Sequence, residues 1–129
     1  MERKSLFSLH ARVESFAQAF NGLKLFFRLE HNAWIHLIIT CMVTTFALLL
    51  EFDYQEWFWL ILVIVGVFSA EILNSAIEKL ADIVEPEYDP KIKVVKDMAA
   101  AAVLMVSIGA AAIGLLLFVP KLFERFCSL

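Results

Sequence analysis

Polar residues recur along one short stretch of the chain, residues 70–82, which reads A-E-I-L-N-S-A-I-E-K-L-A-D. The residues concerned are Glu71, Asn74, Ser75, Glu78 and Asp82. On an ideal helix, at about 100° per residue, all of them except Asn74 fall within about 60° of one another, and Asn74 flanks the group. Acids repeated along one helix face repel one another unless a cation or a proton lies between them. Glu71 and Glu78 therefore indicate a metal or proton site.

Glu71 directly follows an almost uninterrupted apolar run, residues 57–70. An ionisable group at bilayer depth costs roughly 3 kcal/mol, so such groups usually face the interior of a helix bundle and mark a functional path. The alternative is that the helix is leaving the membrane and its acids simply contact water. We favour that alternative for Asp82, and the functional interpretation for Glu71 together with Glu78.

The composition indicates an integral membrane protein. The chain has 129 residues, and we interpret it as a single domain over 1–129. Hydrophobic residues make up 61% of it, and its mean hydropathy is +0.78. Both values exceed those of ordinary soluble domains. The formal charge of −3, with no basic cluster, gives no indication of nucleic-acid binding.

Three apolar segments are long enough to cross a bilayer, and we expect an all-α fold built on them. The expected spans are about 33–52, 57–83 and 97–119. Pro86 and Pro90 bracket a short loop between the second and third spans. We expect Asp97 to cap or complement the positive end of the third helix, and Pro120 to end that helix.

The segment before the first span, about 5–29, is expected to form an amphipathic helix on the membrane surface. Its apolar residues recur at spacings of four and three: Leu9, Val13, Phe16, Phe20, Leu23 and Phe27. This narrow apolar stripe is too interrupted to cross a bilayer, but it suits the boundary between headgroups and hydrocarbon.

The distribution of basic residues predicts the orientation of the chain. Nine of the eleven lysines and arginines precede the first span or lie between Lys79 and Lys96; the other two are Lys121 and Arg125. The positive-inside rule then places the N-terminus and the 78–97 loop in the cytoplasm, and the C-terminus outside. The candidate acids Glu30, Glu71, Glu78 and Asp97 would thus meet at the cytoplasmic face. A soluble co-substrate there would be an intracellular one, and nucleotide is the obvious candidate.

Two motifs carry a resemblance to a known family. They are E-I-L-N-S-A-I-E at 71–78 and V-V-K-D-M-A-A-A-A-V-L at 94–104, with R-L-E-H-N upstream at 28–32. Together they resemble the small prokaryotic diacylglycerol kinase family, which includes undecaprenol kinases. The resemblance covers roughly residues 11–121. It implies a homotrimeric enzyme of the bacterial inner membrane, with a surface helix and three spans per subunit and active sites between subunits.

The resemblance also implies a reaction and roles for individual residues. The γ-phosphoryl group of ATP would pass to a lipid hydroxyl, with Glu71 as general base and Asn74 helping to hold the site in order. Glu30 and Glu78 would bind the divalent ion, Mg²⁺, that accompanies ATP. Glu71 and Ala100 would lie at the lipid substrate. The residues implied at the nucleotide are Arg12, Glu30, Glu78, Glu87, Tyr88, Asp89, Lys96 and Asp97.

Elementary chemistry agrees with these roles. Phosphoryl transfer requires positioning of the reactants and neutralisation of charge on the transferring oxygens, and oxygen-only ligands suit Mg²⁺. The chain departs from other kinases because it has no G-x-x-x-x-G-K-[ST] loop and no protein-kinase signature. Within the family pattern, Val95 replaces a common alanine, and Arg12 is the nearest match to an early basic residue.

Several functional alternatives stay open on the sequence. The ending L-L-L-F-V-P-K-L, residues 115–122, is similar to the undecaprenol kinase branch, whereas E-I-L-N-S-A-I-E also occurs in the diacylglycerol branch. We favour undecaprenol as the acceptor. From other classes, a small proton-coupled transporter needs only Glu71, and a non-catalytic membrane scaffold needs only the small residues of the third span.

Overall fold

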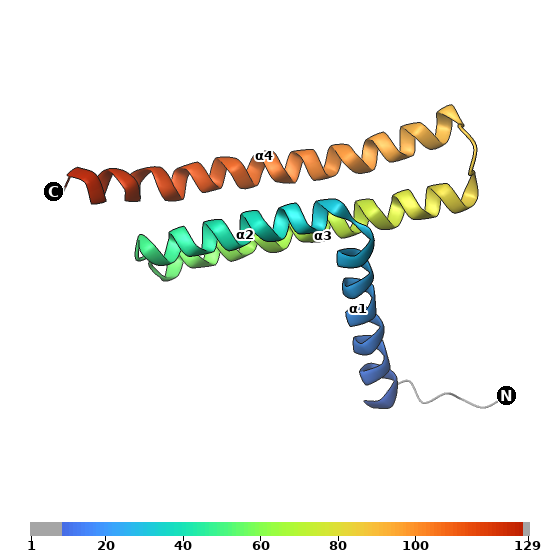
Figure 1. The fold of residues 1–129 in the computed structure, drawn as a ribbon, viewed down its shortest axis with the longest axis horizontal. Coiled ribbons are helices and arrows are strands. Elements are labelled where there is room, and N and C mark those ends of the chain that lie inside the picture. Colours follow the sequence, from blue (N-terminus) through green and yellow to red (C-terminus); the bar gives the residue numbers. More distant parts are fainter. Residues whose placement is uncertain (1–8, 128–129) are drawn as a thin grey trace.

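The computed structural model describes residues 9–127, and it is helical almost throughout. The helices are α1 (Leu9–Leu29), α2 (His31–Leu49), α3 (Tyr54–Val84) and α4 (Pro90–Cys127). Figure 1 shows α2, α3 and α4 side by side along one long axis, while α1 points away from them. The expected surface helix began at about residue 5, and its first residues, 5–8, lie outside the described part of the chain.

Three of the helices are long and apolar enough to cross a membrane. They are α2, α3 and α4 as far as Arg125. Most of their large apolar side chains point outward, and few residues of the described chain are buried. An outward apolar surface of this extent suits lipid or neighbouring subunits rather than water. The prediction of an all-α chain with three membrane-length helices is confirmed.

The turn between α2 and α3 is fixed by a capping box and a small apolar core. Asp53 Oδ1 accepts hydrogen bonds from the backbone amides of Gln55 (2.8 Å) and Glu56 (2.9 Å), and Glu56 Oε2 accepts one from the Asp53 amide at 2.7 Å. This reciprocal pair starts α3 at Tyr54, three residues earlier than the expected span. Phe52 turns inward and packs against Phe118 of α4, with ring centroids 4.8 Å apart.

The last helix differs from expectation at both of its ends. The prediction that Asp97 caps it is wrong, because α4 begins at Pro90 and Asp89 Oδ1 accepts from the amides of Lys91 (2.6 Å) and Ile92 (3.2 Å). Proline suits this position, since the first turn of a helix needs no amide hydrogen there.

The prediction that Pro120 ends the helix is also wrong, because α4 continues through Pro120 to Cys127. A proline inside a helix removes one backbone hydrogen bond and crowds the preceding turn. Tertiary contacts flank the proline on both sides. Phe118 packs on Phe52, and Lys121 Nζ lies 3.2 Å from Glu56 Oε2 in the first turn of α3.

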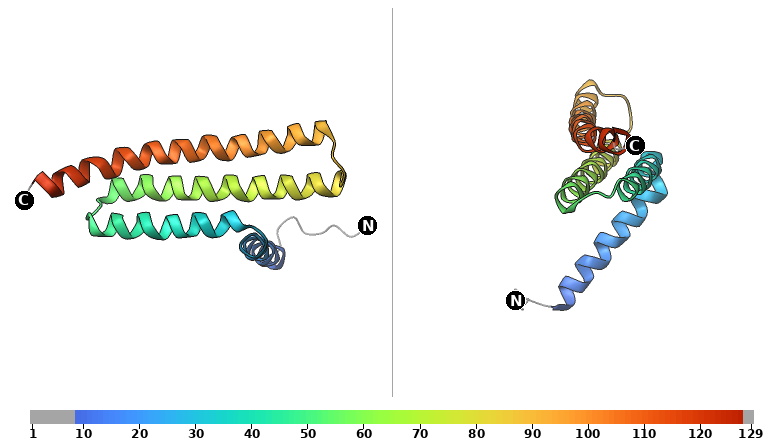
Figure 2. Two further views of the ribbon diagram at one scale, coloured as in Figure 1. Left: turned by 45° about the horizontal axis from the view of Figure 1, so that its top comes forward. Right: turned by 90° about the vertical axis from the view of Figure 1, so that its left-hand side faces the viewer.

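A sharp elbow at Glu30 joins α1 to α2. Glu30 is extended, with φ −106° and ψ 120°, and its side chain does not cap α2. Trp34 Nε1 donates a hydrogen bond to the carbonyl oxygen of Phe27 at 2.8 Å, across the break. The ring of Phe27 also lies 6.1 Å from that of Phe68 in α3. These contacts hold the elbow against the middle of α3, and Figure 2 shows the change of direction from two sides.

Candidate active site

The acidic face of α3 passes from buried to exposed along its length. Glu71 is 3% exposed and Ser75 is 6% exposed, which is unusual for polar residues in a chain with so few buried groups. One turn further on, Glu78 is half-buried, and Asp82 is exposed. Glu71 and Ser75 therefore lie inside the bundle, on the face that the helical spacing predicted. Asp82 contacts water, as the sequence suggested for that residue.

Asn74 links this face internally and leaves one acceptor free. Its Nδ2 donates to Glu78 Oε1 at 3.2 Å, and its Oδ1 is buried without a hydrogen-bond partner. Buried polar atoms are nearly always hydrogen-bonded in folded proteins. An unpaired acceptor beside a carboxylate therefore fits a ligand that brings a hydrogen-bond donor or a cation.

Glu30 reaches α3 from the elbow, but it meets a lysine there. Its Oε1 accepts from Lys79 Nζ at 2.5 Å, and its side chain is 21% exposed. Among residues 9–127, no group of three or more acidic, histidine or cysteine side chains is arranged to hold a metal. Mg²⁺ in kinases often takes only one or two carboxylates and completes its shell with phosphate oxygens and water. Glu30 and Glu78 are oxygen donors of that kind, but in a single chain Glu30 pairs with Lys79 and Glu78 with Asn74.

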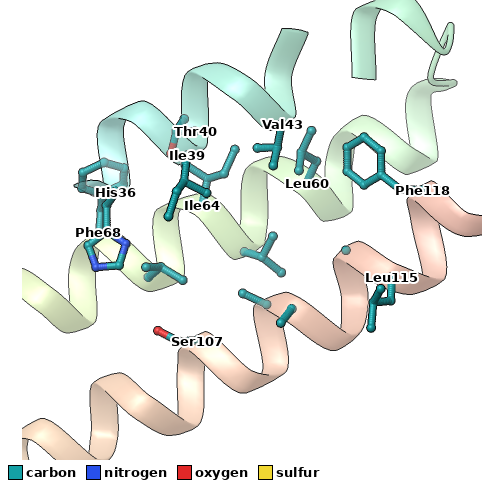
Figure 3. Close-up of a pocket in the computed structure, with 15 residues that line it drawn as sticks. His36, Ile39, Thr40, Val43, Leu60, Ile64, Phe68, Ser107, Leu115 and Phe118 are labelled. Carbon is teal, nitrogen blue, oxygen red and sulfur yellow. The ribbon is translucent and has the colours of Figure 1, made fainter. Parts of the chain in front are cut away.

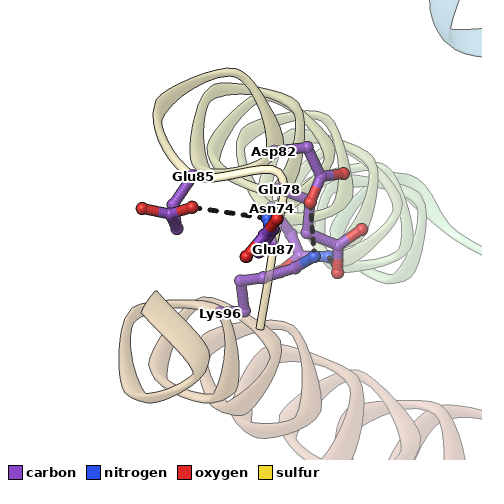
Figure 4. Close-up of polar contacts among 6 residues, drawn as sticks. All are labelled: Asn74, Glu78, Asp82, Glu85, Glu87 and Lys96. Atoms are coloured by element: carbon purple, nitrogen blue, oxygen red, sulfur yellow. Dashed lines mark hydrogen bonds and ion pairs between the residues drawn. The ribbon is translucent and has the colours of Figure 1, made fainter. Parts of the chain in front are cut away.

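The loop between α3 and α4 forms a polar cavity of about 360 Å³. Its lining brings together acids and lysines from both helices: Asp82, Glu85, Pro86, Glu87, Tyr88, Asp89, Ile92, Lys93, Lys96 and Asp97. Lys96 Nζ donates to Asp82 Oδ1 at 2.9 Å, and Lys93 Nζ donates to Asp97 Oδ2 at 2.5 Å. Figure 4 shows Lys96 extending from α4 toward the acids of α3. Such a mixed-charge cavity can hold a phosphate-bearing molecule together with a cation.

The structure groups some of the predicted site residues and separates others. Five of the residues expected at the nucleotide line the same cavity: Glu87, Tyr88, Asp89, Lys96 and Asp97. Glu30 and Glu78, also expected at the nucleotide, do not line it, and neither do Glu71 and Asn74. Arg12 lies near the start of α1, and Ala100 is exposed on α4.

Sequence reasoning did not assign three charged residues to this cavity, one of which, Asp82, it had interpreted as simply contacting water. Asp82, Glu85 and Lys93 also line the cavity. The spacing of four residues between Lys93 and Asp97 was a signal for their pairing.

An apolar groove lies between α2, α3 and α4, with a volume of about 590 Å³. Its lining is apolar except for His36, Thr40 and Ser107. In Figure 3, His36 and Phe68 stand at one end of the groove and Phe118 at the other. Glu71 follows Phe68 by three residues, within about 60° around the helix. The groove thus ends next to the buried carboxylate, and it suits hydrocarbon rather than a polar solute.

The structure combines three membrane-length helices with an apolar groove and a charged cavity, and sequence comparison supplies the family. Residues 17–118 match the family model described as prokaryotic diacylglycerol kinase, so the chain belongs to that family. The protein is a membrane-bound lipid kinase, and membership of this family implies a lipid substrate with ATP as co-substrate. The transporter and scaffold alternatives are therefore set aside.

The chain is similar in sequence to an undecaprenol kinase and to a diacylglycerol kinase. It is 38% identical over 114 residues to the undecaprenol kinase of Bacillus subtilis (strain 168), which covers 88% of this chain and 93% of that protein. It is 35% identical over 109 residues to the diacylglycerol kinase of Synechocystis sp. (strain ATCC 27184 / PCC 6803 / Kazusa). That match covers 84% of this chain but only 62% of the longer relative.

Proposed function

We propose that this protein phosphorylates undecaprenol, using ATP and Mg²⁺, at the cytoplasmic face of the inner membrane. The observation that carries the proposal is the burial of Glu71, which lies one helical turn beyond Phe68 at the end of the apolar groove (Figure 3) and on the same face of α3 as Glu78. Similarity to an undecaprenol kinase over nearly the whole of both chains supports this acceptor over diacylglycerol. The second candidate, a diacylglycerol kinase making phosphatidic acid, is favoured by the other relative.

Glu71 acts in this proposal as the general base. The hydroxyl oxygen of the lipid attacks the γ-phosphorus of ATP, the bond to the β,γ-bridging oxygen breaks, and ADP leaves. The hydroxyl proton passes to the Glu71 carboxylate. Asn74 holds Glu78 in place through its amide, and its unpaired Oδ1 is available to a donor on the substrates. Positioning of this kind supplies most of the catalysis in phosphoryl transfer.

Glu30 and Glu78 would hold Mg²⁺, which when bound supplies positive charge to the phosphate oxygens. Lys96 and Asp97 would contact the nucleotide with the 87–89 loop, since all of these residues line one cavity. We also assign Arg12 to the nucleotide and Ala100 to the lipid, on the family resemblance alone. Both residues lie away from the cavity and the groove of a single chain, which fits an active site completed by a neighbouring subunit.

The arrangement in the membrane follows from charge and shape. We propose a cytoplasmic N-terminus and an external C-terminus, because nine of the eleven basic residues precede the first span or lie between the second and third spans. The helix α1 would lie on the membrane surface, with its exposed Leu9, Val13, Phe16 and Phe20 in the headgroup boundary. A homotrimer is supported by the outward apolar surface and by the small residues of α4, which allow close helix contact.

The choice of acceptor is tested by supplying purified protein with labelled ATP and one lipid at a time. We expect phosphate transfer to undecaprenol to exceed transfer to diacylglycerol by about tenfold or more in kcat/KM, which corresponds to about 1.4 kcal/mol in the transition state. Equal or greater transfer to diacylglycerol would reverse the choice of acceptor. Lack of transfer to either lipid would remove the proposed reaction.

The groove is proposed to hold the hydrocarbon chain of the acceptor, and two glycines of α4 provide a matched test. Gly114 lines the groove and Gly109 does not, yet a Cβ atom would meet nothing within 4 Å at either position. Leucine is also the better helix former, so neither variant should weaken α4 itself. We expect Gly114→Leu to raise the KM for lipid about tenfold, the effect of a clash of about 1.4 kcal/mol, and Gly109→Leu to leave it unchanged.

The readouts are lipid KM, ATP KM and the size of the assembly in detergent. If Gly114→Leu changed the assembly size while lipid KM stayed constant, the groove would be a contact between subunits and not a lipid site.

A further inference from the structure

Lys79 lies next to the proposed metal site, and neither the sequence motifs nor the proposed reaction gives it a role. It follows Glu78 directly in α3, and its side chain is 50% exposed. Its ammonium group crosses to the elbow between α1 and α2 and lies 2.5 Å from Glu30 Oε1. The Glu30 carboxylate does not cap α2, and it accepts its hydrogen bond from Lys79 instead.

The same kind of pairing recurs around the polar end of the bundle. Lys96 holds Asp82 at 2.9 Å, and Lys93 holds Asp97 at 2.5 Å. Lysine ammonium groups thus neutralise carboxylates that would otherwise repel one another at this end. A bound divalent cation would neutralise the same carboxylates. A lysine ammonium group and a divalent cation are therefore alternative partners for these carboxylates. The Glu30 carboxylate can bind only one of the two closely.

We propose that Lys79 exchanges partners during the catalytic cycle: it holds Glu30 while no metal is bound, and it contacts the nucleotide phosphates when the metal occupies Glu30. This inference rests on the proposed function, because it takes Glu30 as a metal ligand. A metal on Glu30 repels the nearby ammonium group, and the phosphates that arrive with it provide the nearest new negative charge. The flexible, half-exposed lysine stem allows the change without movement of α3.

The exchange predicts opposite effects on two binding reactions when the charge is removed. In Lys79→Met, a divalent cation no longer competes with an ammonium group for Glu30, so metal binding in the absence of nucleotide should become about two- to fivefold tighter. Binding of an ATP analogue with saturating Mg²⁺ should become about two- to fivefold weaker, because a phosphate partner is lost. A purely structural ion pair would weaken both reactions or neither.

The experiment uses full-length protein in lipid nanodiscs and does not depend on turnover. Mn²⁺ binding without nucleotide is followed by electron paramagnetic resonance, and binding of a non-hydrolysable ATP analogue by calorimetry. Lys79→Arg keeps the charge and should bind both ligands as the wild type does. The matched control is Lys121→Met, which removes the ion pair with Glu56 at the other end of the bundle and should change neither constant.

The outcomes separate this inference from the function on which it rests. Tighter Mn²⁺ binding together with weaker nucleotide binding in Lys79→Met supports the exchange. Unchanged constants, two changes in the same direction, or an equal effect of Lys79→Arg would overturn the exchange alone, provided that Glu30→Gln weakens Mn²⁺ binding. If Glu30→Gln left Mn²⁺ binding unchanged, the metal assignment of the proposed function would fail, and the exchange with it.

Discussion

Replacing Glu71 by glutamine should lower the rate of lipid phosphorylation by about 10²- to 10⁴-fold, the usual contribution of a general base. The carboxylate is buried one helical turn beyond Phe68, at the end of the apolar groove (Figure 3) where we propose that a lipid hydroxyl arrives. Glutamine has the same shape but cannot accept the hydroxyl proton. Because the base acts only in the transition state, kcat should fall while KM for ATP and for lipid stays nearly constant.

The measurement is steady-state transfer of labelled phosphate, with thermal unfolding and assembly size recorded for the same samples. Glu71→Gln should fold as the wild type does, since a neutral side chain of equal volume replaces a buried acid. Glu14→Gln on the exposed face of α1 is the control for a lost carboxylate, and its kcat should remain within about twofold of the wild type. An activity near the wild-type value in Glu71→Gln would exclude this residue as the base.

The three membrane-length helices could be predicted from hydropathy alone, but their ends could not. Apolar runs of membrane length determine α2, α3 and α4 whatever their neighbours are. The ends depend on contacts between segments far apart in sequence. Phe52 leaves the first apolar run to pack on Phe118, and Lys121 pairs with Glu56, so the last helix continues past Pro120. A local rule for proline carries no information about that pairing.

The acidic face of the site was also predictable, because it depends on one helix only. Helical spacing placed Glu71 with Ser75 on one side, and both are buried. The partner of Glu30 was not predictable, because it depends on the direction in which the elbow turns α1 against α3. The hydrogen bond from Trp34 to Phe27 and the aromatic contact with Phe68 determine that direction. Lys79 therefore emerged as a neighbour of Glu30 only from the fold.

Replacing Glu78 by glutamine should change the dependence of activity on Mg²⁺ more than any other property. Removal of a partner of a metal ligand commonly costs about 10- to 100-fold in metal affinity, and loss of the ligand itself should cost at least as much. The Glu78 carboxylate accepts from Asn74 Nδ2 at 3.2 Å, and a glutamine carbonyl can still accept that hydrogen bond. The local structure should therefore survive while the charge is lost.

The expected result is a shift of half-maximal activity to Mg²⁺ concentrations higher by about tenfold or more, with activity partly recovered at saturating metal. This recovery distinguishes Glu78 from Glu71, whose loss no concentration of metal should repair. Glu51→Gln, at the turn on the far side of the bundle, is the control, and its Mg²⁺ titration should match the wild type. Mn²⁺ binding measured without nucleotide should weaken in Glu78→Gln as well. An unchanged metal titration would remove Glu78 from the metal site and leave Glu30 as its only assigned carboxylate.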